Sequence, residues 1–258
     1  MRNALILGSG RSGTSMLAGC LHGAGYFLGS NLMPPNEQNP KGYYESFDVE
    51  AINEDLLGQV CPRRPFGRFG RFLFPSRPRR PQRWLAWVPL DVQFDVGEQL
   101  RRRMVDQLAT TPFCFKDPRF CYTLPAWRDL LADPLHLVVF REPGRTMASI
   151  LRTVAEEPYL RDLKIGADQV LAVWCAQYRH ILERHARQGD WLFVHYDQIL
   201  DGSAAERLEG ALGAPLDLSF PEPSLKRSPD VAAVSEEARG VYAALCRRAG
   251  YRSDVAEP

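Results

Sequence analysis

The stretch that most constrains the fold of this chain is its opening, residues 4–21. A short apolar run at residues 4–7 predicts a buried strand, and apolar residues return at helical spacing from Thr14 onward. Between the two lies a turn, residues 8–15, that contains three glycines, one arginine and several hydroxyl groups. Such a strand–turn–helix unit can cradle an anion, because glycines let backbone N–H groups approach it and the helix N-terminus carries about half a positive charge.

The glycine spacing of this turn also resembles the phosphate loop of nucleoside triphosphatases, Gly8-x4-Gly13, but with a difference. Thr14 stands where those enzymes carry lysine, and the cation lies inside the loop as Arg11. Three glycines alone would equally fit an ordinary tight turn between a strand and a helix. The arginine and hydroxyl groups favour anion binding instead. The predicted ligands in this loop are Gly10, Arg11, Ser12, Gly13, Thr14 and Ser15.

Composition favours a globular protein and offers no sign of a nucleic-acid or membrane partner. Its 258 residues are 45% hydrophobic and 24% charged with a net charge of +1, so no global basic field points to a polyanionic partner. Six cysteines lack the spacing of metal ligands, which favours a reduced, cytoplasmic setting and predicts no metal site. No run approaches the roughly 20 apolar residues of a membrane helix, and the opening apolar run is too short for a signal peptide.

Strand and helix patterns alternate along most of the chain. Apolar runs predict further strands at residues 113–116, 135–141 and 191–196. Helical spacing predicts helices at residues 48–57 (capped by Ser46), 97–108, 124–131, 144–153, 168–187, 204–212 and 234–249. This order predicts an α/β fold with three layers, a mostly parallel central sheet and helices on both faces. We expect one α/β domain at residues 1–220, followed by a C-terminal linker and helix at residues 221–258.

Residues 61–95 form an insertion rich in arginine, proline and phenylalanine. No Asp or Glu occurs between Leu56 and Leu90, whereas eight arginines lie between Arg63 and Arg83. Arginines interleaved with aromatics can bind single-stranded nucleic acid, but nothing else in the chain favours such a partner. We interpret the insertion as a lid or acceptor-facing loop, with its phenylalanines packed inward and its arginines in solvent.

Charged residues follow two of the predicted strands directly. Lys116 and Asp117 end the strand at residues 113–116, and Arg141 ends the next one. Open α/β sheets place their ligand crevice at these carboxyl ends. Ser149, in the helix that follows Arg141, could converge with it on one anion. Asp117 is expected to orient Lys116 or Arg119 rather than to act directly.

Together these motifs resemble those of the sulfotransferases that use 3′-phosphoadenosine 5′-phosphosulfate. The opening loop resembles the family's 5′-phosphosulfate loop in the Arg-Ser-Gly-Thr form of its tyrosylprotein and bacterial branches. Residues 138–143, with Ser149 eight residues after Arg141, resemble its 3′-phosphate site. Lys-Asp-Pro at residues 116–118 resembles the tyrosylprotein branch. The late strand at residues 193–200 also resembles the family, with Asp where Glu is usual. The similarity covers roughly residues 3–60 and 113–215, with a P-loop-like fold.

The resemblance implies an enzyme that transfers a sulfuryl group to a hydroxyl of a small-molecule, glycan or natural-product acceptor by in-line displacement, without a metal. Arg11 and Lys116 would neutralise charge on the transferring group and on the leaving 5′-phosphate. Arg141 and Ser149 would hold the 3′-phosphate, and Tyr196 would line the adenosine pocket.

An alcohol acceptor needs a general base. By the resemblance we assign this role to Glu45, because carboxylate bases serve the branch with the Arg-Ser-Gly-Thr loop. Glu37, Asp117 and His136 stay open as alternatives.

Several aromatic residues indicate an apolar or aromatic acceptor: Tyr43, Tyr44, Phe66, Phe69 and Phe72.

Two other functions stay open at this point. One is a nucleotide-dependent kinase with a degenerate P-loop, which would need Mg²⁺ and an acidic ligand such as Asp117. The other is a non-catalytic nucleotide- or nucleic-acid-binding protein that uses the arginine-rich residues 61–90 as its surface.

Overall fold

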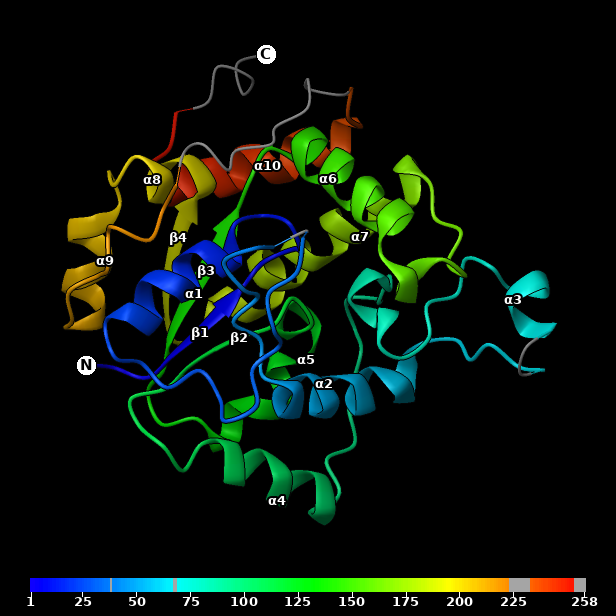
Figure 1. Ribbon diagram of the computed structural model, residues 1–258, viewed down its shortest axis with the longest axis horizontal. Helices are drawn as coiled ribbons and strands as arrows, with labels where there is room; N and C mark the ends of the chain where they lie inside the picture. Colours follow the sequence, from blue (N-terminus) through cyan, green and yellow to red (C-terminus); the bar gives the residue numbers. More distant parts are fainter. Residues whose placement is uncertain (38, 67–68, 223–232, 253–258) are drawn as a thin grey trace.

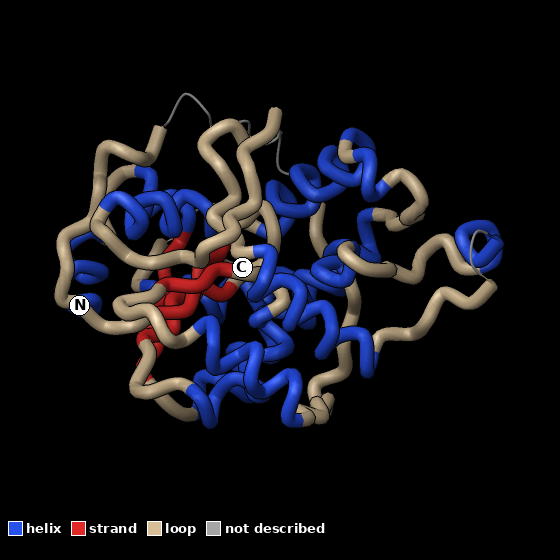
Figure 2. Tube along the Cα trace, turned by 60° about the horizontal axis from the view of Figure 1, so that its bottom comes forward, coloured by secondary structure: helices blue, strands red, loops and turns tan. Residues whose placement is uncertain are grey.

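A four-stranded parallel sheet forms the centre of the computed structural model, which describes residues 1–37, 39–66, 69–222 and 233–252 (Figures 1 and 2). All neighbouring strands run parallel, in the order β2-β1-β3-β4. The strands are β1 (Ala4–Leu7), β2 (Cys114–Lys116), β3 (Leu135–Phe140) and β4 (Asp190–His195). The four predicted strands and their parallel pairing are thus confirmed.

Helices cover both faces of this sheet, because successive strand residues point in opposite directions. Ala4 and Ile6 belong to one apolar core, which includes residues of the helices on the first face: α1 (Thr14–Gly23), α8 (Tyr196–Leu200) and α9 (Ala205–Leu212). Leu5 and Leu7 belong to the other core. That core includes residues of α2 (Phe47–Val60), α4 (Glu98–Gln107), α5 (Phe120–Trp127), α6 (Pro143–Glu156), α7 (Ala167–Arg179) and α10 (Glu236–Ala249). The predicted three-layer α/β fold is confirmed.

The helix after β2 begins earlier than the sequence pattern predicted. The predicted helix at residues 124–131 is instead α5, which starts at Phe120, followed by the short 3₁₀ helix η3 (Arg128–Leu130). Pro125 lies inside α5, where it cannot donate to the Cys121 carbonyl. That carbonyl lies 3.0 Å from Nε2 of His185, so a side chain replaces the missing backbone donor.

The predicted helix at residues 168–187 is divided into three parts. Helix α7 is followed by a π-helical turn, η5 (His180–Arg184), and a 3₁₀ turn, η6 (His185–Arg187). Nε2 of His180 lies 3.1 Å from the Val88 carbonyl. His180 therefore has a structural role.

The insertion at residues 61–95 packs differently from the prediction. Phe66, Phe69 and Phe72 are 66, 74 and 70% exposed, on a projecting arm that carries the short helix α3 (Gly70–Leu73; Figure 1). At the base of the arm, Arg64 is buried and donates to the Asp162 carboxylate at 2.7 Å. The arginine takes the inward position because it finds a charged partner there, and the expectation of inward phenylalanines was wrong.

The end of the insertion does enter the protein. The 3₁₀ helix η2 (Gln82–Leu85) places Trp84 and Leu85 in the core. Another short 3₁₀ helix, η4 (Pro158–Leu160), lies beside it, since Gln82 Nε2 donates to the Tyr159 carbonyl at 2.7 Å.

The C-terminal helix α10 is part of the same body. Tyr242 and Leu245 belong to the core that also contains Phe140 of β3.

Most of the linker predicted between residue 221 and this helix lies outside the described residues. In the described ranges, each helix is too short or too polar to cross a bilayer.

Candidate functional site

The separate motifs predicted from the sequence open into one cavity of about 790 Å³ at the carboxyl ends of β1, β2 and β3. Loop residues, strand ends and helix α6 all contribute to its wall. The predicted site residues that line it are Gly10, Arg11, Gly13, Thr14, Ser15, Glu45, Lys116, Arg141, Ser149 and Tyr196. One predicted residue, Ser12, is missing from this set.

Two glycines hold the loop backbone against the aromatic walls of the cavity. A Cβ atom on Gly10 would lie 2.6 Å from the Trp84 ring, and one on Gly13 would lie 2.5 Å from the Tyr196 ring. Gly13 also has a φ of +96°, which favours glycine, and it directly precedes α1. The loop can therefore present its backbone at the α1 N-terminus only with glycine at these positions.

The Ser12 side chain faces away from the cavity. It is fully buried, and its Oγ lies 3.2 Å from the hydroxyl of Tyr178 on α7. That hydroxyl donates to the Val139 carbonyl at 2.8 Å and accepts from the Ser9 N–H at 3.1 Å. The Ser12 hydroxyl thus anchors the loop to α7 and β3 rather than pointing into the cavity, and a role of Ser12 in cofactor binding stays a prediction. Sequence reasoning missed Tyr178, because a tyrosine at helical spacing resembles any core residue.

The loop and helix α6 meet through Arg11. Its Nε donates to Ser149 Oγ at 3.2 Å, and the Arg141 guanidinium lies over the Tyr196 ring, 4.4 Å from the centroid. Burial, together with the charge of Arg152, lowers the pKa of Arg11. Burial and the charges of nearby arginines, Arg11 included, likewise lower the pKa of Arg141. Positive charge is thus concentrated in a poorly solvated wall, where a bound anion would reduce the repulsion.

Lys116 links three parts of the site. Its ammonium pairs with the Glu45 carboxylate and donates to Ser15 Oγ at 3.2 Å. The side chains of Lys116 and Glu45 are only 2 and 12% exposed. The end of β2, the first turn of α1 and the segment before α2 are therefore joined at one charged contact inside the cavity.

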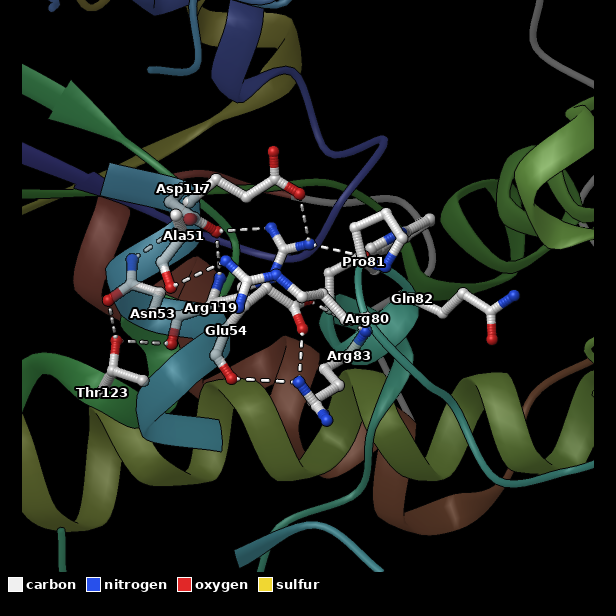
Figure 3. A network of polar contacts seen from close by, with 12 residues as sticks. Ala51, Asn53, Glu54, Arg80, Pro81, Gln82, Arg83, Asp117, Arg119 and Thr123 are labelled. Carbon is white, nitrogen blue, oxygen red and sulfur yellow. Dashed lines mark hydrogen bonds and ion pairs between the residues drawn. The ribbon is translucent and has the colours of Figure 1, made fainter. Parts of the chain in front are cut away.

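A second polar network lies beside this contact, around Arg119 (Figure 3). Its Nε donates to Glu54 at 2.7 Å, Nη1 to Asp117 at 3.2 Å and Nη2 to Glu50 at 3.1 Å. These carboxylates raise the pKa of Arg119 although its burial opposes this. Asp117 thus orients Arg119, which is one of the two roles expected for it. Sequence reasoning missed Glu50 and Glu54, whose i, i+4 spacing on one helix face was the available signal.

Among the four candidate bases, Glu45 is the one that lines the cavity in the described part of the chain. Asp117 is bound to Arg119, and Glu37 is exposed. His136 stacks on Trp191, with ring centroids 4.3 Å apart, and burial lowers its pKa to about 4.

The aromatic residues expected to face an acceptor lie in different places in the structure. Tyr43 lines the cavity, whereas Tyr44 packs against Phe220 and the three phenylalanines of the arm are exposed.

The described residues include no group of three or more His, Cys, Asp or Glu that could hold a metal ion.

The sequence matches no protein-family model and no curated protein. The structure is similar to a sulfotransferase domain from the curacin biosynthetic pathway, with a TM-score of 0.53 and 13% identity, over 98% of this chain and 99% of that one. It also resembles the sulfotransferase domain from the Synechococcus PCC 7002 olefin synthase, with a TM-score of 0.49 and 16% identity, over 93 and 94% of the two chains. The curacin likeness shows that this chain has the P-loop-like fold of a sulfotransferase domain.

Proposed function

We propose that this protein is a sulfotransferase that moves a sulfuryl group from 3′-phosphoadenosine 5′-phosphosulfate to a hydroxyl group of an acceptor. The observation that carries the proposal is the Arg11–Ser149 hydrogen bond inside the cavity. It joins the glycine-rich loop to the helix after Arg141, so two anion-binding segments distant in sequence face one space. A nucleotide with anionic groups at both its 5′ and 3′ positions fits such a pair of sites.

The residues present suit this donor. Gly13 lines the cavity directly before α1, so an oxyanion there would meet the positive end of this helix, and Arg11 and Lys116 supply positive charge. Arg141 and Ser149 form the second anion site, where they would hold the 3′-phosphate. The Tyr196 ring, already against Arg141 and Gly13, would contact the adenosine. Thr14 and Ser15 would add hydroxyl and N–H donors.

The proposed reaction is an in-line displacement at sulfur. The acceptor oxygen forms a new bond to sulfur while the bond from sulfur to the 5′-phosphate oxygen breaks, and its electron pair stays on the phosphate. Glu45 takes the proton of the acceptor hydroxyl. Lys116 lies against both Glu45 and Ser15, so its charge stabilises the phosphate oxygen as negative charge develops there. Positioning and charge stabilisation carry most of the catalysis in this type of transfer.

The kinase alternative has less support from the geometry. Its candidate magnesium ligand was Asp117, whose carboxylate accepts from Arg119 at 3.2 Å and from Asn53 at 3.1 Å. Both oxygens of this carboxylate are thus already hydrogen-bonded, and Asp117 is not among the described residues that line the cavity.

Two measurements test the proposal. Adenosine 3′,5′-bisphosphate should bind without added metal and more tightly than ATP with Mg²⁺. The protein should also transfer label from ³⁵S-labelled 3′-phosphoadenosine 5′-phosphosulfate to an acceptor within a panel of alcohols and phenols. Binding of ATP with Mg²⁺ in preference to the bisphosphate would favour a kinase. Bisphosphate binding without transfer to any acceptor would favour a non-catalytic nucleotide-binding protein.

A further inference from the structure

The wall that helix α2 contributes to the cavity is acidic, in contrast to the donor side. Glu50 and Glu54 of this helix line the cavity, together with Glu45 just before it. The loop and α6 contribute Arg11 and Arg141 to the same cavity. A cavity that offers both cationic and acidic side chains can bind two reactants of opposite charge.

Two of these three glutamates have their charge matched by close cations. Glu45 pairs with Lys116. Glu54 accepts from Arg119 at 2.7 Å and from the Arg83 side chain at 2.9 Å. These carboxylates need no further partner.

Glu50 is different, since one arginine serves it and two other carboxylates. Its Oε1 accepts from Arg119 Nη2 at 3.1 Å, and this is its polar contact within the described residues. Glu50, Glu54 and Asp117 carry three formal negative charges, whereas Arg119 and Arg83 carry two positive ones. One negative charge is therefore left over, and Glu50 is the member of the group with the fewest bonds.

The pKa of Glu50 agrees with this excess of one negative charge. Burial raises its pKa from an ordinary 4.5 to about 7, the attraction of Arg119 opposes the shift, and Asp117, Glu45 and Glu54 add to it. An ionised Glu50 is thus unfavourable in the cavity as it stands. A cation placed beside it would make the ionised form favourable.

Two aromatic side chains line the same cavity as this carboxylate. Arg119 Nη2, which binds Glu50, also donates to the Pro81 carbonyl at 2.6 Å, so Glu50 lies beside the turn that leads to Trp84. Trp84 and Tyr159 both line the cavity. Aromatic faces next to a carboxylate bind ammonium groups well, because the ring quadrupole attracts cations.

We propose that Glu50, with Trp84 and Tyr159, binds an ammonium group of the acceptor, so that the acceptor class is a hydroxyl compound that carries a primary amine. This inference rests on the proposed sulfotransferase function and names the substrate class of the same cavity. Glu50 is then a specificity residue: it holds the amine, while Glu45 takes the proton of the hydroxyl.

Pairs of acceptors that differ by one ammonium group test the inference: tyramine against 4-ethylphenol, and glucosamine against glucose. We expect the wild-type protein to prefer the amine of at least one pair by about tenfold or more in kcat/KM, the range of a charged hydrogen bond. Glu50→Gln should reduce that preference to about onefold to threefold, mainly through a higher KM for the amine.

Asp48→Asn provides the matched control, because it removes the same charge from an exposed position on the same helix. This variant should keep the wild-type preference. An equal preference for amine and neutral acceptors in the wild-type protein, or an unchanged preference in Glu50→Gln, would overturn the inference.

A pH series on the wild-type protein gives an answer even if Glu50→Gln fails to fold. With tyramine against 4-ethylphenol, the preference for the amine should grow as the pH rises through about 7, since Glu50 becomes ionised while the alkyl ammonium of tyramine stays protonated. The groups that face Glu50 are Arg119, Asp117, Glu45 and Glu54. A preference that does not change with pH would contradict the proposal.

Binding of adenosine 3′,5′-bisphosphate, measured in parallel, separates the acceptor class from the proposed function. Normal bisphosphate binding and sulfuryl transfer without amine preference would reject the acceptor class and leave the proposed function intact. Loss of both would reject the proposed function itself.

Discussion

Nε of Arg11 donates to Oγ of Ser149 at 3.2 Å, which joins two residues 138 positions apart at one cavity wall. Arg11 belongs to the loop after β1, and Ser149 to the second turn of α6, the helix after β3. The parallel pairing of β1 and β3 makes this contact feasible, since it brings both strand ends to the same edge of the sheet. The contact therefore depends on the topology of the sheet as well as on the two side chains.

Arg11→Ala should weaken adenosine 3′,5′-bisphosphate binding by about tenfold or more, because it removes a buried charged donor from the first anion site. Sulfuryl transfer should fall further, by about a hundredfold, if Arg11 also stabilises charge in the transition state. Calorimetry and single-turnover transfer measure the two effects. Arg101→Ala, at an exposed position on α4, is the control. Wild-type binding and transfer in Arg11→Ala would remove this residue from the site.

Ser149→Ala should reduce discrimination between nucleotides rather than abolish binding. The wild-type protein should bind adenosine 3′,5′-bisphosphate more tightly than adenosine 5′-monophosphate, and the variant should narrow this difference by about tenfold, the effect of one hydrogen bond to a charged group. Competition binding with both nucleotides measures the change. Ser76→Ala, on the exposed arm, should leave the difference as it is. An unaltered ratio in Ser149→Ala would place the 3′-phosphate elsewhere.

Gly13→Ala should lose both stability and donor binding, because its Cβ would lie 2.5 Å from the Tyr196 ring at a φ of +96°. Gly25 provides a close control: its φ is +91°, and nothing lies within 4 Å of the position that a Cβ atom would take there, so Gly25→Ala tests backbone strain alone. Each substitution should cost about 1–2 kcal/mol of unfolding free energy through strain. Only Gly13→Ala should also impair bisphosphate binding. Equal binding by both variants would show that contact with Tyr196 does not matter for the donor.

Glu45→Gln should slow sulfuryl transfer by about a hundredfold or more while bisphosphate binding changes little, since a glutamine cannot accept the hydroxyl proton. Its amide oxygen can still accept from Lys116, which keeps the contact inside the cavity. Single-turnover transfer at saturating donor measures the loss. Glu37→Gln, an exposed acid of the same loop region, should transfer at the wild-type rate. A fast Glu45→Gln enzyme together with a slow Glu37→Gln enzyme would reverse the assignment.

Glu50 should make stability depend on pH in an unusual direction. Its pKa is raised from 4.5 to about 7 in the folded protein, so its folded form binds more protons than its unfolded form between these values. Its contribution to stability is full below about pH 4.5 and is lost as the pH rises through about 7. The free energy of unfolding of Glu50→Gln, relative to wild type, should therefore increase from about pH 5 to about pH 8.

Chemical denaturation of the wild-type protein and of Glu50→Gln, from about pH 5 to about pH 8, measures this difference in the free energy of unfolding. Taking the difference removes the opposing effect of buried histidines, such as His185, whose pKa burial lowers to about 3. A difference that is constant with pH would show that Glu50 keeps an ordinary pKa in the folded protein.

Local patterns in the sequence were enough to predict the fold and most of the selected residues that line the cavity. The apolar runs that became β1 and β3 predict strands because they are short, continuous and followed by a turn or a proline. Arg141 could be selected because it directly follows a strand, and Arg11 and Gly13 because they lie in the turn between a strand and a helix; a parallel sheet brings such segments together. These inferences depend on neighbours along the chain, which a sequence displays.

The sequence by itself determined the alternation of strands and helices, the glycine-rich cradle and the cations at the strand ends. Only the tertiary structure decided that Ser12 faces Tyr178, that the phenylalanines of the arm lie in solvent, and that Arg119 is shared by three carboxylates. The reason is physical: where a side chain points depends on which distant partner offsets its burial. Such partners, like Tyr178 and Glu50, are set by packing between elements that are distant in sequence rather than by their position along the chain.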